Sequence, residues 1–166
     1  MEIHLAVLLF GVSGLFGKLL SLPSIIIVLG RVFFSSIFLL FLLLYMKNDI
    51  KLKEKKHYGY LAIMGIILAI HWTTFFQSIQ VSTVAIGLLA FSTFPVFVTF
   101  LEPYFFREQI KLSDIVVAII AFFGVMLVIP SFRLENGATQ GVIWGLVSGF
   151  TYAILSILNK KYVQEY

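Results

Sequence analysis

Four polar or charged side chains lie within or at the end of long apolar stretches of this sequence. Arg31 lies eight residues into the second stretch, His71 and Trp72 lie near the middle of the third, and Lys18 lies near the end of the first. An arginine at the centre of a bilayer costs about 2.5–3.5 kcal/mol on insertion scales, so we expect Arg31 to face a partner or a water-filled cavity. If these side chains converge, they form a positively charged chamber that suits a carboxylate or phosphate group. Arg31, His71 and Trp72 are therefore candidate substrate-binding residues.

Each of these residues also has a structural interpretation. Arg31 can bind backbone carbonyls between helices, His71 can form an interhelical hydrogen bond, and Trp72 can serve in packing alone. Lys18 can extend its ammonium group to the outer membrane interface. Ser35 follows Arg31 by one helical turn and would extend a polar stripe on the same face.

The fourth apolar stretch combines hydroxyl groups with two prolines. Ser92 and Thr93 precede Pro95 near its middle, and Pro103 lies toward its end. A proline removes a helical hydrogen-bond donor and frees the carbonyl four residues earlier, so kinks are expected at both prolines. The freed carbonyls and the hydroxyls of Ser92 and Thr93 are candidates for substrate binding. Alternatively, the hydroxyls satisfy the carbonyls and have no further role.

Glu102 stands beside the second of these prolines, near the predicted cytoplasmic end of the stretch. A carboxylate at this depth is a candidate gating or proton-linked group. The structural alternative is an ion pair with Arg107 or Lys111, the nearest basic residues that follow it.

Six apolar stretches must position these side chains, and each is close to the roughly 20 residues that cross a bilayer as a helix. A hydrophobic fraction of 60% with only 12% charged residues leaves too little polar surface for a water-soluble globule, which excludes a cytosolic enzyme. The fold class is therefore an all-α integral membrane protein, a polytopic helical bundle. The predicted helices are 3–21, 23–46, 57–78, 82–105, 113–130 and 139–162.

Basic residues fall in alternate gaps between these stretches, which predicts the topology. Cytoplasmic loops of membrane proteins carry an excess of Lys and Arg, so the basic gaps are expected inside. The chain then begins in the cytoplasm, its sixth helix ends there, and it belongs in the plasma membrane. Topology also accounts for the net charge of +4, so we expect no nucleic-acid partner. The basic residues in question are Lys47, Lys51, Lys53, Lys55, Lys56, Arg107, Lys111, Lys160 and Lys161.

The sequence shows no chemistry of a cofactor or a metal. It contains no cysteine, which excludes a disulfide framework and a thiolate metal site, and it has no HExxH motif or phosphate-binding glycine loop. The sequence Gly11-Val12-Ser13-Gly14 matches the short GxSG pattern of rhomboid-type intramembrane serine proteases, and six helices is their usual number. This alternative requires His71 to reach Ser13 within about 3 Å as its base.

Small residues recur at spacings of four within several stretches. Such spacing lets helices approach closely in lipid, so packing is the expected role. The pairs and stripes are Ser13 with Gly17, Gly65 with Ala69, and Gly141 with Gly145 and Gly149.

Residues 131–138 contain Arg133, Glu135, Asn136 and Gly137 and are predicted to form an extracytoplasmic linker between two units, 1–130 and 139–166. Val12-Ser13-Gly14-Leu15 in the first helix is echoed by Val147-Ser148-Gly149-Phe150 in the sixth. An offset of five helices would place the second copy upside down, as in the inverted repeats of many transporters. Chance similarity between two glycine-rich helices is the alternative.

The run from His71 to Phe97, HWTTFFQSIQVSTVAIGLLAFSTFPVF, resembles the third and fourth helices of EamA-type members of the drug/metabolite transporter superfamily. The likeness extends over residues 3–130 and into the opening of a second repeat. It includes Gly14 to Lys18, Pro23 with Arg31, Arg107-Glu108, and Gly124-Val125.

This resemblance implies a ten-helix secondary transporter built from two inverted five-helix repeats, in which small metabolites or drugs cross by alternating access. Members are often exporters with proton coupling. The chain instead stops after six helices, which indicates a partial sequence lacking four helices of a second repeat, with a homo-oligomer as the alternative. Its expected partners are a small-molecule substrate and the lipid bilayer, and a non-transporting membrane scaffold or subunit is the rival function.

Overall fold

The computed structural model describes residues 2–47, 54–107, 109–127 and 135–164, and all regular structure within these ranges is α-helical. This confirms the predicted class of a polytopic helical membrane protein. The described helices are α1 (Glu2–Leu19), α2 (Ser24–Tyr45), α3 (Lys55–Val81), α4 (Val84–Phe91), α5 (Phe94–Phe106), α6 (Leu112–Leu127) and α7 (Gly137–Gln164).

Four of the described segments are long and apolar enough to cross a membrane, by length and composition. They are α2, α3, the segment Val84–Phe106 that contains α4 and α5, and α7, while α6 is a shorter apolar helix of 16 residues. Large apolar side chains lie on the outside, as with Phe41 on α2, which is 74% exposed. A protein surface of this kind is stable in hydrocarbon and not in water.

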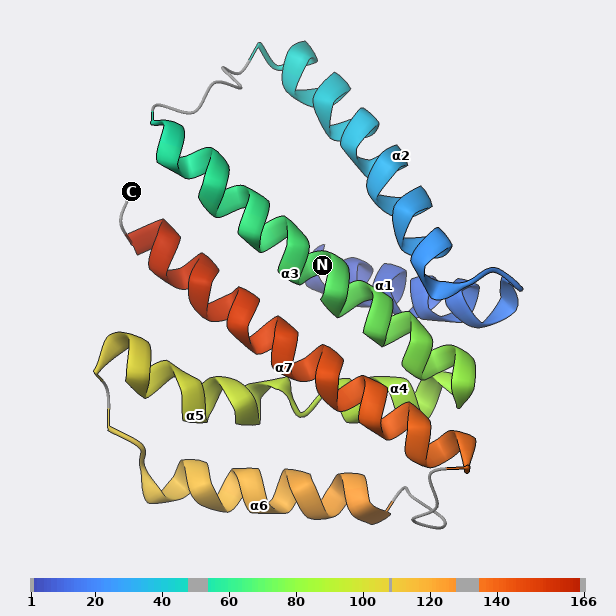
Figure 1. The fold of residues 1–166 in the computed structure, drawn as a ribbon, viewed down its shortest axis with the longest axis vertical. Helices are drawn as coiled ribbons and strands as arrows, with labels where there is room; N and C mark the ends of the chain where they lie inside the picture. Colours follow the sequence, from blue (N-terminus) through green and yellow to red (C-terminus); the bar gives the residue numbers. More distant parts are fainter. Residues whose placement is uncertain (1, 48–53, 108, 128–134, 165–166) are drawn as a thin grey trace.

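Helices α3 and α7 form the centre of the bundle (Figure 1). They lie side by side and run in opposite directions, and the contact between them is the most extensive in the molecule. Helices α4 and α5 also pack against α7, and α6 packs against α5. Helix α2 leans away from α3 along its length, so the two are closest near the beginning of α2 (Figure 1).

The glycine stripe of α7 explains this close contact. A Cβ atom at Gly145 would lie under 3.0 Å from Ala90 of α4, and one at Gly141 would lie under 3.0 Å from Ser82. Real Cβ atoms do not approach so closely, so only glycine fits at both positions. The packing role predicted for this stripe is confirmed. For Gly65 on α3 it is wrong, because a Cβ atom there would meet nothing within 4 Å.

The predicted fourth helix is two helices, since α4 ends at Phe91 and α5 begins at Phe94. The interruption falls on Ser92 and Thr93, and Pro95 follows two residues later in the first turn of α5. A proline fits there because the first turn of a helix lacks intrahelical donors in any case. Pro103 lies inside α5, which ends three residues later at Phe106.

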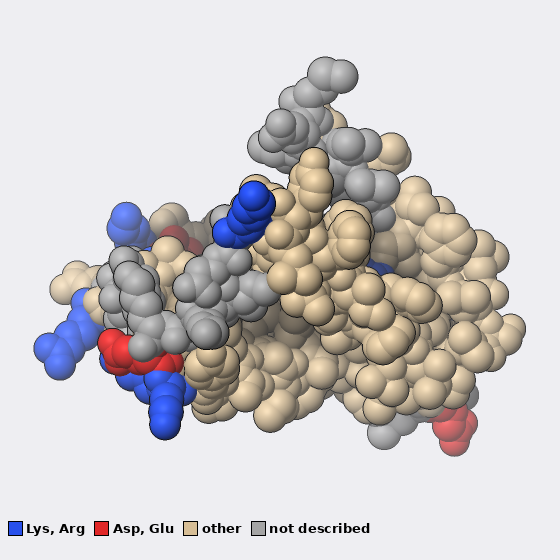
Figure 2. All heavy atoms as spheres, turned by 90° about the horizontal axis from the view of Figure 1, so that it is seen from above, with Lys and Arg blue, Asp and Glu red and all other residues tan. Residues whose placement is uncertain are grey.

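Basic side chains gather at one end of the molecule, on the left in Figure 2. Figure 1 shows that α3 begins on this side and that α5 and α7 end there. The predicted basic gaps that the structure describes therefore share one side of the bundle. Of the predicted linker, residues 131–134 lie outside the described residues, as do residues 128–130 of the predicted fifth helix, and α7 begins at Gly137.

Candidate functional site

Arg31 is a half-buried cation on α2 whose partners are a hydroxyl group and two aromatic rings. Its Nη1 donates a hydrogen bond to Ser13 Oγ of α1. Its Cζ lies 4.3 Å from the ring centroid of Trp72 and 5.2 Å from that of Phe76, both on α3. None of its partners among the described residues is a carboxylate. Its positive charge is thus oriented but not neutralised.

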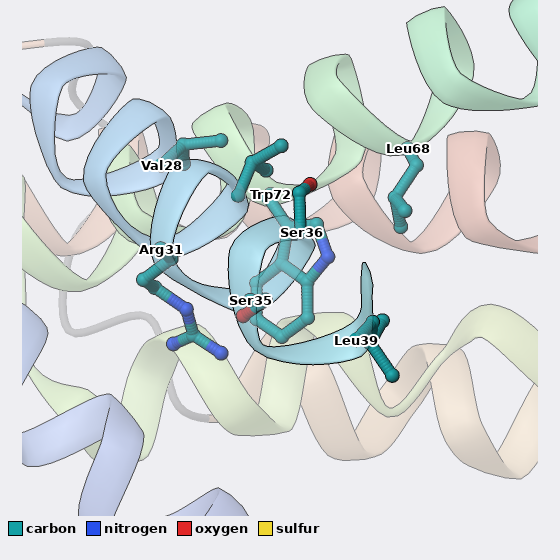
Figure 3. Close-up of a pocket in the computed structure, with 8 residues that line it drawn as sticks. Val28, Arg31, Ser35, Ser36, Leu39, Leu68 and Trp72 are labelled. Atoms are coloured by element: carbon teal, nitrogen blue, oxygen red, sulfur yellow. The ribbon is translucent and has the colours of Figure 1, made fainter. Parts of the chain in front are cut away.

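A cavity of about 270 Å³ lies beside Arg31, between α2 and α3, and we call it the Arg31 cavity (Figure 3). Ser35 and Ser36 line it, and neither hydroxyl has a hydrogen-bond partner among the described residues. A cation and two free hydroxyls therefore face one space beside an indole ring. The remaining lining residues are Val28, Val32, Leu39, Leu68 and Trp72.

His71 faces α7, away from Arg31. Its Nδ1 lies 2.9 Å from Ser148 Oγ and 3.0 Å from Ser148 O, and the residue is only 4% exposed. It lines a second cavity of about 160 Å³, which we call the aromatic cavity, together with Trp72, Phe91 and Tyr152. Because Trp72 lines both cavities, it separates His71 from Arg31. The two predicted residues thus line adjacent cavities and do not share one chamber.

Lys18 is a helix cap and does not contribute to this site. Its Nζ donates hydrogen bonds to the carbonyl oxygens of Ile79, Gln80 and Ser82, at 3.1, 2.9 and 2.6 Å. Carbonyl groups at the end of a helix lack intrahelical partners and carry partial negative charge, which a lysine neutralises. Lys18 therefore fixes the end of α3 to α1.

Ser92 and Thr93 donate their hydroxyl hydrogens to the main chain at the end of α4. Ser92 Oγ bonds Leu89 O and Thr93 Oγ1 bonds Ala90 O, each at 2.7 Å. Thr93 is buried and lies against Gly149 of α7. Both hydroxyls are thus engaged with the main chain where the helix is interrupted, although the carbonyls they bond are not that of Phe91, which Pro95 frees.

Glu102 of α5 forms an ion pair with Lys160 of α7. The ammonium group of Lys160 also lies 4.4 Å from the ring centroid of Phe106. The sequence suggested Arg107 or Lys111 as the partner because they are close along the chain, and that expectation is wrong. The pair links the fourth and sixth predicted helices at the basic end of the bundle.

The serine protease geometry is not formed. Ser13 accepts a hydrogen bond from Arg31, while the His71 ring is engaged with Ser148. Within the described part of the chain, no group of three or more His, Cys, Asp or Glu residues is placed to bind a metal ion.

Two partners that sequence reasoning did not assign are the serines of the repeated Val-Ser-Gly sequence. Ser13 binds Arg31 and Ser148 binds His71. The echo itself was a usable signal, because it marked the two serines that contact the intramembrane basic side chains.

Comparison with known proteins agrees with these observations. An uncharacterized transporter of Bacillus subtilis (strain 168) is 27% identical over 162 residues, which cover 94% of this chain and 51% of that relative. An uncharacterized transporter of Archaeoglobus fulgidus is 32% identical over 92 residues, covering 55% of this chain and 32% of the relative. An S-adenosylmethionine uptake transporter of Rickettsia bellii is 27% identical over 134 residues, covering 80% and 44%.

The chain thus spans about half the length of most of the curated relatives it matches. No solved structure matches it. These relatives are all named as transporters. The model of the EamA-like transporter family matches residues 3–129, and the chain belongs to that family.

Proposed function

We propose that this chain forms one wall of the substrate cavity of a secondary transporter, which moves a small metabolite or drug across the membrane by alternating access. Membership of the EamA-like family supports this proposal. The observation that carries it is the position of Arg31, a cation beside a cavity in an apolar span, with no carboxylate partner in the described part of the chain. A charge in that position is costly unless an aqueous path or an anionic ligand reaches it.

The substrate would place an anionic group, a carboxylate or a phosphate, against Arg31. A guanidinium binds such groups through two parallel hydrogen bonds, and the hydroxyls of Ser35 and Ser36 would supply further donors. Trp72 would stack against a planar part of the same molecule. S-adenosylmethionine, named for the Rickettsia relatives, has both a carboxylate and a planar adenine and is a suitable first probe.

The remaining wall would come from a second, inverted repeat, of which residues 139–166 form the first helix and residues 131–138 the extracytoplasmic linker. The echo between the first and sixth predicted helices supports this division of the chain. A homo-oligomer is the alternative source of the missing wall.

The basic end of the bundle would face the cytoplasm, with the chain in the plasma membrane and its N-terminus inside. The alternation of basic gaps supports this orientation. Reporter groups attached at Lys47 and Lys161 are expected to be accessible from the cytoplasmic side alone. Accessibility from outside would contradict this orientation.

We further propose export as the direction and proton exchange as the coupling, with Glu102 or His71 as the proton-linked group. The resemblance to EamA-type exporters supports this choice. Transport that does not respond to an imposed pH gradient would remove the coupling. Net uptake, the direction in the name of the Rickettsia relatives, would reverse the direction.

The test uses the complete gene product in liposomes, with exchange of labelled S-adenosylmethionine and of a panel of labelled amino acids and nucleotides. Arg31→Ala is expected to lower exchange about tenfold or more, because a hydrogen bond to a charged group contributes about 1.5–3 kcal/mol. Lys161→Ala removes a cation outside the cavity and is the matched control. Wild-type exchange in Arg31→Ala would remove this residue from the mechanism, and a wild-type protein without flux would favour a non-transporting subunit.

A further inference from the structure

A third cavity, of about 400 Å³, lies between α3 and α7, and we call it the α7 cavity. On the α7 side it is lined by Tyr152, Ser156 and Asn159, which follow one another at spacings of four and three. Residues at these spacings share one helix face, and the three extend over about 10 Å at 1.5 Å per residue. We call them the polar face of α7. The other lining residues are Leu61, Met64, Gly65, Leu68 and Leu155.

The polar groups of this face have no hydrogen-bond partner among the described residues. Other hydroxyls of the same helix are bonded, since Ser148 bonds His71 and Thr151 bonds the carbonyl of Val147. A polar group that lacks a partner within a membrane span is costly unless water or a ligand reaches it. Water or a ligand in the α7 cavity would supply these groups with hydrogen-bond partners.

On the α3 side of the α7 cavity, the wall opposite the polar face leaves open space. Gly65 of α3 lines the α7 cavity, and a Cβ atom added there would meet nothing within 4 Å. Glycine at this position is not required by packing, and its absent side chain enlarges the space in front of α7.

The three cavities form a series along α3. Leu68 lines the Arg31 cavity, the aromatic cavity and the α7 cavity, and Tyr152 lines the last two. Figure 3 shows Leu68 at the edge of the Arg31 cavity. The three cavities are therefore adjacent, and the α7 cavity, with Asn159, lies nearest the basic end of the bundle.

We infer that the polar face of α7 is a second substrate subsite, which binds the neutral, hydrogen-bonding part of a metabolite whose anionic group lies at Arg31. None of the residues that line the α7 cavity is charged, so a phenol, a hydroxyl and an amide select amide, hydroxyl or heterocyclic groups. The substrate class is thus an elongated metabolite with an anionic group near one end and a neutral polar group at the other. The position of its anionic group rests on the proposed function.

The first test measures whether water reaches the polar face. The described chain has no cysteine, so Ser156→Cys introduces a single thiol into it. In the complete gene product in membranes, this thiol is expected to react with a charged methanethiosulfonate reagent, as identified by mass spectrometry of the labelled peptide. Ile157→Cys is the matched control, because Ile157 is only 1% exposed. Equal lack of reaction at both positions would overturn the inference.

The second test fills the cavity from the opposite wall. Gly65→Leu is expected to lower the ratio of S-adenosylmethionine exchange to methionine exchange about tenfold, because methionine has the same carboxylate but lacks the nucleoside. Gly59→Leu, also on α3 and also with nothing within 4 Å, is the control for the added side chain. An unchanged ratio in Gly65→Leu would overturn the subsite.

The two tests also separate this inference from the proposed function. Reaction of Ser156→Cys in a protein that carries neither probe would support a hydrated polar face and count against transport of these probes. Exchange of both probes with an unreactive Ser156→Cys would support the transporter and overturn the subsite.

Discussion

The two sides of α3 differ in how they are packed. Toward α7, the helix contacts a glycine stripe, and Ser78 Oγ donates a hydrogen bond to Gly141 O at 2.5 Å. Toward α2, the same helix borders the Arg31 cavity, and the contacts between α2 and α3 are much fewer than those between α3 and α7.

This difference indicates which elements move together. Close backbone contact and buried hydrogen bonds make α3, α4 and α7 one rigid unit, because such packing does not deform continuously. Helix α2 contacts the unit mainly near its own beginning, through Ile27 and Val28. The Arg31 cavity therefore lies between this closely packed unit and a helix that contacts it loosely.

The largest effect on stability is expected from a change in the glycine stripe of α7. Gly145→Leu is expected to destabilise the protein by about 3 kcal/mol, because its side chain would clash with Ala90 in a packed seam. The measurement is unfolding in mixed detergent micelles followed by circular dichroism. Stability equal to the wild type would show that α7 can separate from α4 at no cost.

A smaller effect is expected from the buried hydrogen bond on the same side. Ser148→Ala removes the contact of Ser148 Oγ with His71 Nδ1 at 2.9 Å and should cost between about 0.6 kcal/mol, the average for interhelical hydrogen bonds in membranes, and about 1.7 kcal/mol, the largest such value. Thr151→Val is the control, since the Thr151 hydroxyl bonds carbonyls of its own helix. Equal unfolding energies for the two variants would contradict an interhelical role for Ser148.

The ion pair at the basic end should contribute less. A double-mutant cycle with Glu102→Gln and Lys160→Met is expected to give a coupling energy of about 0.5 kcal/mol that falls with added salt, because both side chains are partly exposed. A coupling energy that is large and independent of salt would indicate a tightly closed contact between α5 and α7.

A small effect of the opposite sign is expected where α3 faces the α7 cavity. Gly65→Leu should change the unfolding energy by less than about 1 kcal/mol, in the stabilising direction, because leucine favours helix and meets no clash here. Unfolding is measured as for Gly145→Leu. Strong destabilisation would mean that the space in front of Gly65 is closed in the membrane.

Much of the fold could be predicted from local sequence. Apolar stretches of about 20 residues predict membrane helices whatever their neighbours are, because lipid requires each backbone to satisfy its own hydrogen bonds. Pro95 marked the interruption of the fourth helix, since the effect of a proline is local. The stripe of Gly141, Gly145 and Gly149 predicted close packing because its spacing alone places these residues on one face.

The partners of the candidate residues could not be predicted in the same way. Arg31 and Ser13 are 18 residues apart, Glu102 and Lys160 are 58 apart, and His71 and Ser148 are 77 apart. Local spacing suggested nearer partners for Glu102, and similar depth in the membrane suggested one shared chamber for Arg31 and His71.

The sequence by itself determined that the chain lies in a membrane, where its helices are and which side chains are costly there. Only the tertiary structure decided that Arg31 and His71 line different cavities on either side of Trp72. The physical reason is that a helix fixes the depth of a side chain through its rise per residue. The direction in which the side chain points depends on the rotation of the helix against its neighbours, which packing determines.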